Sequence, residues 1–425
     1  MSRVRADSAW KFELRVIDCQ LWYNDSKTTT AEVLMERYDF DAPVDRRGSH
    51  SMKFDAAAAM GKREGLLSMW VADMDFTVPP AVVEALHQRV DHAVFGYTNP
   101  WDGYREAVVS WMARYGWQVS PNWIVPTPGV VFALAMAVRA FTEPGDAVVI
   151  QRPVYYPFTN VIERNGRRVA NAPLAYQDGI YSIDFDALEQ TIQESGAKLF
   201  LLCNPHNPGG RLWTRDELAR IAEIALRNDV IVVSDEIHMD FVRPGYEHTV
   251  FATLDDQIAQ RCVVCTAASK TFNLAGLETS NIIIPNGELR RVFKDAMHAT
   301  GTNRPNVLGL VATEACYRQG AEWLAQLKKY LEGNWALVES YLAEHAPQLH
   351  LVPAQSTYLA WVDCRELGLY GEDLRALIED EAGLWLDLGD MFGPEGDGFI
   401  RLNLATQRAT VQRALTQLTD AIARM

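Results

Sequence analysis

Two polar residues that directly follow buried strands constrain the fold of this chain more than any other feature. The apolar run at residues 230–234 predicts a core strand, and Asp235 follows it at once. A second apolar run, residues 262–265, leads into a turn that carries Lys270. In α/β proteins, ligands and chemistry lie at the ends of core strands. The sequence therefore predicts that an acid and an amine occupy neighbouring strand ends.

This pairing of acid and amine fits the needs of pyridoxal phosphate. That cofactor bonds to a lysine amine through its aldehyde, and a carboxylate beside the pyridine nitrogen keeps its ring cationic, so that the ring can accept the electrons of a carbanion. Lys270 has to be neutral for this chemistry, and burial beside another cation lowers a lysine pKa. An isolated lysine is usually a solvated surface residue. The surrounding motifs therefore have to decide the function.

Five motifs surround the pair, in unbroken order along the chain. They occupy residues 69–76 (MWVADMDF), 95–98 (FGYT), 203–210 (CNPHNPGG), 234–238 (SDEIH) and 269–276 (SKTFNLAG). With these motifs, the chain from about Tyr38 to its last residue resembles the MalY/PatB group of cystathionine β-lyases. That group belongs to the class I/II aminotransferase-like, fold-type-I pyridoxal phosphate enzymes. Residues 1 to about 35 are not covered by the resemblance.

The resemblance implies an α/β protein of the pyridoxal-phosphate-dependent transferase fold type I. A large cofactor-binding domain, residues 80–307, would hold a mostly parallel seven-stranded sheet between helices. A smaller α+β domain would combine residues 36–79 and 308–425. Strand and helix patterns alternate through the middle of the chain, which independently indicates a parallel sheet covered on both faces. Residues 1–35 form an extension without sustained periodicity, to which we assign no role.

On this resemblance, several loops would bind the cofactor ring. Lys270 and Asp235 keep the catalytic roles given above, Asn207 would bind the 3-oxygen of the ring, and Tyr155 would stack on its face. His238 stands where many aminotransferases have a tyrosine, and it is a further candidate for cofactor binding. Without the resemblance, an aromatic ring or a histidine at such a position is more often part of the core.

The cofactor phosphate would be bound at the start of a helix predicted over residues 131–141. A glycine at a helix N-terminus leaves free backbone N–H groups at the positive end of the helix dipole, which suits a phosphate. The candidates here are Gly129, Val130, Val131 and Ser269. In the related enzymes a tyrosine that matches Tyr97 crosses the dimer interface to the partner's phosphate. The resemblance therefore implies a homodimer, with Tyr97 among its catalytic residues.

One position departs from the pattern of the wider family. Many aminotransferases place a phosphate-binding arginine eight residues after the lysine, where this chain has Glu278. A glutamate there would repel a phosphate. Either its side chain points away or another cation compensates, and the sequence leaves both alternatives open.

The substrate-binding candidates lie near the two ends of the chain. Arg401 matches the arginine that binds the α-carboxylate of the amino-acid substrate, by two parallel hydrogen bonds. In the resembled group the segment at residues 69–76 lies over the substrate, so Trp70, Ala72 and Asp73 are candidates to line the pocket. From their residue types alone, the arginine would be an ordinary ion pair and the segment a strand-to-helix turn.

Composition disfavours some classes of binding partner. The formal net charge of −15 disfavours nucleic acid and anionic membrane surfaces. No apolar run approaches the roughly 20 residues that span a bilayer, and no signal peptide is recognisable, so we expect a cytoplasmic protein. The six cysteines are scattered. Cys262 and Cys265 would face opposite sides of one strand, so we expect no metal site.

The sequence thus predicts β-elimination from L-cystathionine or a related L-cysteine S-conjugate, which gives a thiol, pyruvate and ammonia. Lys270 would take the α-proton of the substrate. Transamination is the alternative within catalysis, because it shares the steps up to the carbanion. A regulatory, protein-binding role on an inherited fold is a third possibility, which the presence of both Lys270 and Asp235 disfavours.

Overall fold

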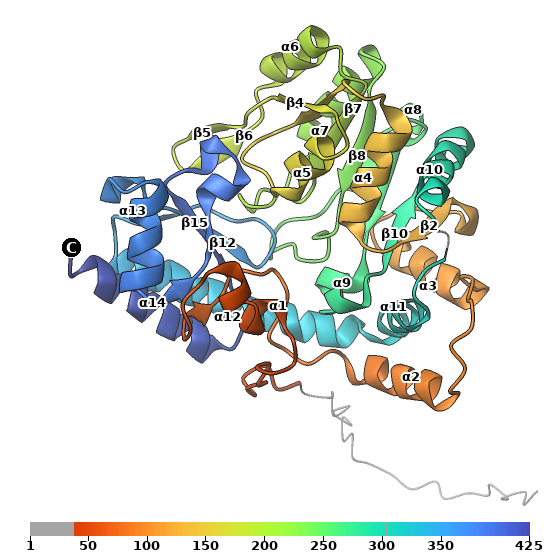
Figure 1. Ribbon diagram of the computed structural model, residues 1–425. Helices are drawn as coiled ribbons and strands as arrows, with labels where there is room; N and C mark the ends of the chain where they lie inside the picture. Colours follow the sequence, from red (N-terminus) through yellow and green to blue (C-terminus); the bar gives the residue numbers. More distant parts are fainter. Residues whose placement is uncertain (1–37, 303) are drawn as a thin grey trace, which may run out of the picture. The chain divides into compact units, whose positions relative to one another are not determined.

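A seven-stranded sheet organises the part of the chain that the computed structural model describes, residues 38–302 and 304–425 (Figure 1). The extension predicted at residues 1–35 lies outside this part. β10 runs antiparallel to both its neighbours, β2 and β9, and the other neighbours in the sheet run parallel. The mostly parallel seven-stranded sheet is confirmed. In spatial order its strands are β2 (Ile124–Thr127), β10 (Ser280–Ile283), β9 (Cys262–Thr266), β8 (Ile231–Asp235), β7 (Leu199–Cys203), β3 (Ala147–Ile150) and β4 (Arg168–Asn171).

Helices bury both faces of this sheet, which explains why its strands are apolar without interruption. One face, toward the viewer in Figure 1, is covered by α4 (Val130–Phe141), α5 (Pro157–Glu163) and α10 (Gly287–Ala299). The opposite face carries α3 (Asp102–Ala113), α6 (Phe185–Ser195), α7 (Arg215–Arg227) and α11 (Val307–Gln319). Successive side chains of a strand alternate between the two cores, so Cys262 and Cys265 lie on opposite faces.

Local sequence signals account for where several helices begin. α4 starts after Gly129, whose φ of +88° is a conformation that glycine adopts without strain. α7 begins with a capping box, in which the Thr214 hydroxyl accepts from the backbone N–H of Glu217 and the Glu217 carboxylate accepts from the N–H of Thr214. α2 (Pro80–Asp91) has proline at its first position, where the missing N–H costs nothing.

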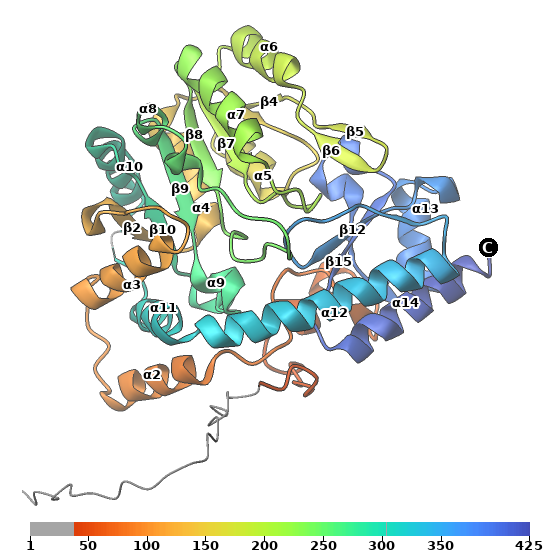
Figure 2. The same cartoon turned by 180° about the vertical axis from the view of Figure 1, so that it is seen from behind.

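A second, four-stranded sheet lies in the C-terminal part of the chain, in the order β11 (His350–Leu351), β12 (Leu359–Asp363), β15 (Phe399–Asn403) and β14 (Asp387–Leu388). The long helix α12 (Ala321–His345) packs along α14 (Arg408–Ile422), as Figure 2 shows. β1 (Leu67–Ser68) pairs with β13 (Leu384–Trp385), so a segment before the large sheet packs beside a segment after it. Met69 and residues between 335 and 421 form a separate core. That core supports a second, smaller domain. Its proposed bounds at residues 80 and 308 stay a prediction, because the buried residues of α11 pack in the core of the large sheet.

Short elements complete the described part. They are α1 (Met52–Asp55), α8 (Asp256–Ala259), α9 (Ala268–Thr271), β5 (Ala175–Gln177), β6 (Ile180–Ser182) and α13 (Gly371–Ala376). α13 ends at Ala376, and the chain continues directly as a π-helical turn over Leu377–Glu381. None of the helices in residues 38–302 and 304–425 has the length and apolar character needed to cross a membrane.

Candidate active site

The carboxyl ends of three neighbouring parallel strands form the floor of the candidate site. Asp235, the last residue of β8, is paired with Cys203 on β7 and with Cys265 on β9. β7 leads directly into the loop that carries Asn207, and β9 leads into the single turn of α9 that carries Lys270. Parallel pairing therefore delivers an amide, an acid and an amine to one edge of the sheet.

The amine of Lys270 is held by a backbone carbonyl. Its Nζ donates to the carbonyl oxygen of Ala72 at 2.8 Å, and the Tyr358 hydroxyl donates to the same oxygen at 2.9 Å. Burial lowers the pKa of Lys270 to about 8, with Arg401 acting in the same direction and the Asp73 carboxylate opposing it. A large fraction of this amine is therefore neutral under mildly alkaline conditions, and such an amine can act as a nucleophile or a base.

Asp235 is a buried acid without a cationic partner. Its Oδ1 accepts from the backbone N–H of Ile237 at 3.2 Å, and no Lys, Arg or His among the described residues forms an ion pair with it. The pKa of Asp235 is raised to about 7, mainly by burial and in part by the charge of Glu236, while the hydrogen bond from Ile237 and the charge of Lys270 oppose the shift. A cationic ligand beside this carboxylate would keep it ionised.

His238 lies in the same buried region. Its ring meets the ring of Tyr358 edge-on, with centroids 5.9 Å apart, and no described residue hydrogen-bonds to its Nδ1. Burial lowers the pKa of His238 to about 3, and the positive charges of Lys270 and Arg401 act in the same direction. The ring is therefore neutral and can exchange hydrogen bonds with a ligand.

Arg401, on β15, is tied to the strand-end loops. Its Nη1 donates to Oδ1 of Asn207 at 2.9 Å, and its Nη2 donates to the carbonyl oxygen of Trp70 at 3.1 Å. Because the Asn207 oxygen accepts from a guanidinium, the NH₂ group of that amide remains available as a donor. The Tyr155 backbone N–H donates to the Asn207 carbonyl at 3.0 Å, which places this tyrosine beside the same loop.

The phosphate candidates lie at the same edge of the sheet as Asp235. β2 and β9 are each antiparallel to β10, so they run in the same direction, and α4 begins just after the carboxyl end of β2. Gly129, Val130 and Val131 therefore start a helix at this edge, with its first N–H groups free of helical partners. Ser269 directly precedes Lys270 on α9.

The segment at residues 70–76 passes over Lys270, and polar side chains from distant positions anchor it. Asn403 donates to the carbonyls of Val71 and Asp73, and Asn273 exchanges hydrogen bonds with the backbone of Met74. Trp70 stacks on Trp385 with ring centroids 4.6 Å apart, and its buried Nε1 has no partner. The segment is therefore fixed at several points along its length.

Sequence reasoning missed an ionic cluster that anchors the Asp73 side of this segment. Arg46 donates to the carboxylate of Asp73 at 2.6 Å and to that of Asp75 at 2.9 Å. The fully buried Lys53 pairs with Asp75 at 2.8 Å. The two aspartates inside an apolar run were the signal, because acids in such a setting need cations. Asp73 thus belongs to this cluster as well as to the surroundings of Lys270.

Asp387 was also missed. It is buried on β14 directly opposite Arg401 and accepts from that residue's Nη2. The signal in the sequence is an acid inside the otherwise apolar run at residues 384–388. Because β14 has only two residues, the pattern did not predict a strand there.

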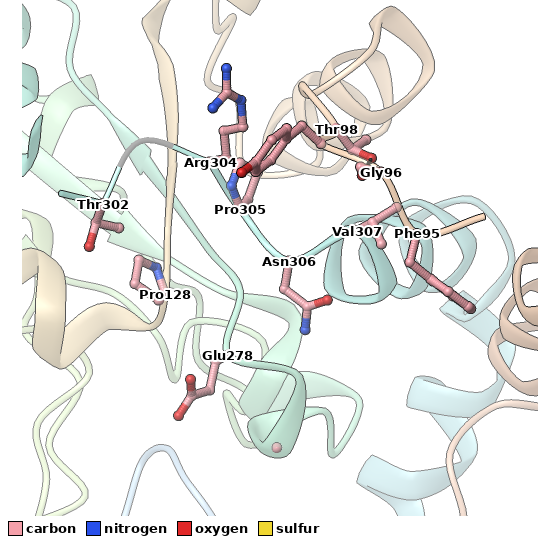
Figure 3. A pocket seen from close by; sticks show the side chains of 12 residues that line it. Phe95, Gly96, Thr98, Pro128, Glu278, Thr302, Arg304, Pro305, Asn306 and Val307 are labelled. Carbon is pink, nitrogen blue, oxygen red and sulfur yellow. Dashed lines mark hydrogen bonds between the residues drawn. The ribbon is translucent and has the colours of Figure 1, made fainter. Parts of the chain in front are cut away.

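Tyr97 lies apart from the other candidates. Its side chain is 92% exposed, and the guanidinium of Arg304 lies 4.7 Å from the centroid of its ring. Both residues line a pocket of about 720 Å³ that also includes Pro128 and Glu278. In Figure 3, Arg304 and Glu278 lie at opposite ends of this pocket. Within the described residues, Tyr97 contacts none of the other site candidates.

Glu278 adopts a left-handed backbone conformation, with φ of +43°. Among the described residues it forms no ion pair with Arg304 or with any other cation. Its charge is therefore uncompensated within this part of the chain.

The strand order and the acid and amine at its edge fit the class I and II aminotransferases, and residues 66–418 match the family described as aminotransferase class I and II. The chain belongs to this family. It is 43% identical over 385 residues to cystathionine β-lyase PatB of Bacillus subtilis, an alignment that covers 90% of this chain and 100% of that protein. It is 35% identical over 390 residues to protein MalY of Escherichia coli, with 91% and 99% covered. The resemblance to the MalY/PatB group is confirmed.

Solved structures agree with the fold. Cystalysin from Treponema denticola, which contains a pyridoxal 5′-phosphate cofactor, superposes with a TM-score of 0.89 at 38% sequence identity. The match covers 92% of this chain and 100% of cystalysin. The fold-type-I architecture is thereby confirmed. In the described part of the chain, no group of three or more His, Cys, Asp or Glu residues is arranged to hold a metal ion.

Proposed function

We propose that this protein is a pyridoxal-phosphate-dependent carbon–sulfur β-lyase. It converts L-cystathionine or a related L-cysteine S-conjugate, together with one water molecule, to a thiol, pyruvate and ammonia. The observation that carries this proposal is the buried acid Asp235, which forms no ion pair within residues 38–302 and 304–425 and lies on the strand next to the one that leads to the Lys270 amine. The similar protein PatB is named a cystathionine β-lyase, which supports the class of reaction. Cystalysin contains pyridoxal 5′-phosphate, which supports the cofactor.

The residues at the strand ends fit pyridoxal phosphate. Asp235 is buried and has no cationic partner in the part of the chain that the structure describes, and a protonated pyridine nitrogen would supply one. Like Nε1 of Trp70, two buried polar atoms near it have no hydrogen-bond partner among the described residues: Nδ1 of His238 and Nε of Arg401. Buried polar atoms without partners are costly unless a ligand satisfies them. This set of unsatisfied groups is what a polar ligand at this edge would complete.

Each residue can be given a part in holding the cofactor. Asn207 would donate its free NH₂ group to the ring's 3-oxygen, and Tyr155 would stack on the ring. The N-terminus of α4, at Gly129, Val130 and Val131, would bind the phosphate, with Ser269 beside it. When bound, the cofactor withdraws electrons from the substrate's α-carbon and so makes its proton acidic.

The substrate would be oriented by the residues above the sheet. Arg401 would bind the α-carboxylate, which fixes the position of the α-carbon relative to Lys270. The neutral Nζ of Lys270 would then accept the α-proton, and its lowered pKa keeps it able to do so near pH 8. Trp70, Ala72 and Asp73 would line the side of the pocket where the β-sulfur leaves as a thiolate.

We further propose that the enzyme is a cytoplasmic homodimer in which each site receives Tyr97 from the partner. The exposed apolar side chains of Val94 and Phe95 beside the exposed Tyr97 support an interface on this surface. No cation in the described part of the chain compensates the charge of Glu278 near the phosphate site. This supports a second copy of the chain as the source of cationic groups there. The cysteines of the described part are free and buried, which supports a reducing compartment.

A direct assay tests the reaction class. The purified, cofactor-loaded protein is incubated with cystathionine and a panel of aliphatic and aromatic L-cysteine S-conjugates, and pyruvate and thiol are both measured. We expect the two products in equal amounts from at least one conjugate, and neither from the Lys270→Ala variant. Release of no pyruvate from any conjugate, by protein that carries the cofactor, would overturn the proposal.

A further inference from the structure

The arginine proposed to bind the substrate's α-carboxylate already belongs to a buried ion pair. Arg401 and Asp387 stand opposite each other on the paired strands β15 and β14. Their side chains are only 2% and 3% exposed. The Asp387 carboxylate accepts from Nη2 of Arg401, so the guanidinium is already paired with an acid before any substrate arrives.

The guanidinium of Arg401 nevertheless has N–H donors that no protein acceptor uses within the described residues. It carries five N–H groups, and three of them serve Asn207, Trp70 and Asp387. The buried Nε has no hydrogen-bond partner in residues 38–302 and 304–425. A second carboxylate can therefore hydrogen-bond to Arg401 without displacing Asp387. Two carboxylates would then share one buried guanidinium.

The surroundings of Asp387 offer little compensation for that second negative charge. Arg401 is the one cation in ion-pair contact with Asp387 among the described residues. The other titratable groups that face it are the hydroxyls of Tyr155 and Tyr156, from the segment before α5, and the pKa of each is raised, mainly by burial and in part by Asp387. Burial raises the pKa of Asp387, and Arg401 opposes this shift. A carboxylate arriving beside it would raise that pKa further.

We propose that Asp387 is a positioning residue that holds Arg401 in the empty site and takes up one proton when the α-carboxylate of the substrate binds. The inference rests on the proposed role of Arg401. Charge balances in this step. The ionised Asp387 and Arg401 sum to zero before binding, and the neutral Asp387, the guanidinium and the substrate carboxylate sum to zero afterwards, with the proton taken from solvent.

Proton uptake at Asp387 predicts a specific pH dependence. Carboxylate binding weakens by up to about tenfold per pH unit above the pKa that Asp387 has in the empty site. An Asp387→Asn variant has no proton to take up. Its affinity should stay constant across the same pH range and exceed that of the wild type at the alkaline end, because the competing negative charge is gone.

The test uses the cofactor-loaded protein and a ligand without an amine, so that only the carboxylate site is probed. 3-(Methylthio)propionate, a thioether carboxylate, is titrated calorimetrically at several pH values in phosphate and in Tris, whose different ionisation enthalpies report the protons taken up. Asp390→Asn is the matched control, because Asp390 is a half-exposed acid three residues further on that does not contact Arg401. We expect uptake approaching one proton in the wild type and in the control, and none in Asp387→Asn.

The outcomes separate this inference from the proposed function. If Arg401→Lys binds the ligand as tightly as the wild type, the role of Arg401 is wrong and the inference loses its premise. If Arg401→Lys binds weakly but Asp387→Asn takes up as many protons as the wild type, the inference is overturned and the role of Arg401 stands. Absence of proton uptake by the wild type also overturns it, and needs no variant. Should Asp387→Asn fail to fold, Asp387→Glu replaces it, because this variant keeps a titratable group. We expect it to shift the pH midpoint of ligand binding. An unchanged midpoint would contradict the inference.

Discussion

The Nζ of Lys270 lies 2.8 Å from the carbonyl oxygen of Ala72, in the middle of the segment that Arg46 and Asp73 anchor. The contact joins the reactive amine to a segment almost two hundred positions away in the sequence. The Asp73 carboxylate also raises the pKa of Lys270, against the burial that lowers it to about 8. The segment therefore positions the amine and tunes its protonation.

Removing the Asp73 charge should make Lys270 neutral at lower pH. We expect the rate at which apoprotein reacts with pyridoxal phosphate to rise with pH, with a midpoint of about 8 in the wild type and a lower midpoint in Asp73→Asn. Asp75→Asn is the matched control, since Asp75 binds the same Arg46 and Lys53 but is not among the groups that shift the Lys270 pKa. An equal shift in both variants would mean that the cluster acts only through structure.

Lys270 should be the residue that bonds to the cofactor. Borohydride reduction of the native loaded enzyme should abolish its visible absorption band and attach the cofactor to a single peptide. Mass spectrometry should locate the adduct at Lys270, and Lys270→Ala should lose activity by roughly 10²–10⁴-fold or more. An adduct on any other lysine would show that the acid and amine at the strand ends do not form the site.

The raised pKa of Asp235 has a consequence for the stability of the apoprotein. Between its ordinary value of 3.8 and about 7, the folded state holds this proton and the unfolded state does not, so the free energy of unfolding falls as pH rises through that window. Asp235→Asn lacks this contribution. We expect the difference in urea-unfolding free energy, wild type minus variant, to decrease by about 1–4 kcal/mol between pH 4.5 and 7. A difference that is flat with pH would show that Asp235 titrates normally.

Mixing two inactive variants tests whether each site borrows Tyr97. In a hybrid of Tyr97→Phe and Lys270→Ala subunits, one of the two sites has both its own Lys270 and the partner's Tyr97. Random exchange makes half the dimers hybrids, so about a quarter of wild-type activity should return. Asp235→Asn mixed with Lys270→Ala should recover none, because both residues serve their own subunit's site. If subunits exchange and the first mixture stays inactive, the sites are self-contained.

Part of this site could be predicted from local patterns. Asp235 and Lys270 follow short apolar runs, and such runs identify buried strands whatever the rest of the chain does. The N-terminus of α4 could be predicted from Gly129 because a glycine before an apolar, helix-period run marks a helix start. The pairing order of the strands, which brings these three places to one edge, came instead from the resemblance to a known family.

The remaining contacts could not be predicted, because they join positions far apart in the chain. Nothing local to Arg46 indicates that it pairs with Asp73, and the loop at residues 45–49 has the composition of a solvated turn. Asp387 is placed by a two-residue strand, too short for any periodicity. Tertiary packing decides these ion pairs, and the sequence shows only that buried charges require partners.

The most direct test of the lyase assignment compares elimination with transamination in one reaction. In the proposed mechanism Lys270 would remove the α-proton in either case, so the two reactions would compete after a common step. Loaded enzyme is given cystathionine and 2-oxoglutarate, and pyruvate and thiol are counted against newly formed glutamate. We predict that elimination exceeds amino-group transfer at least about tenfold, which needs a difference of only about 1.4 kcal/mol between the competing barriers. Glutamate in excess of pyruvate would contradict the assignment and identify the protein as an aminotransferase.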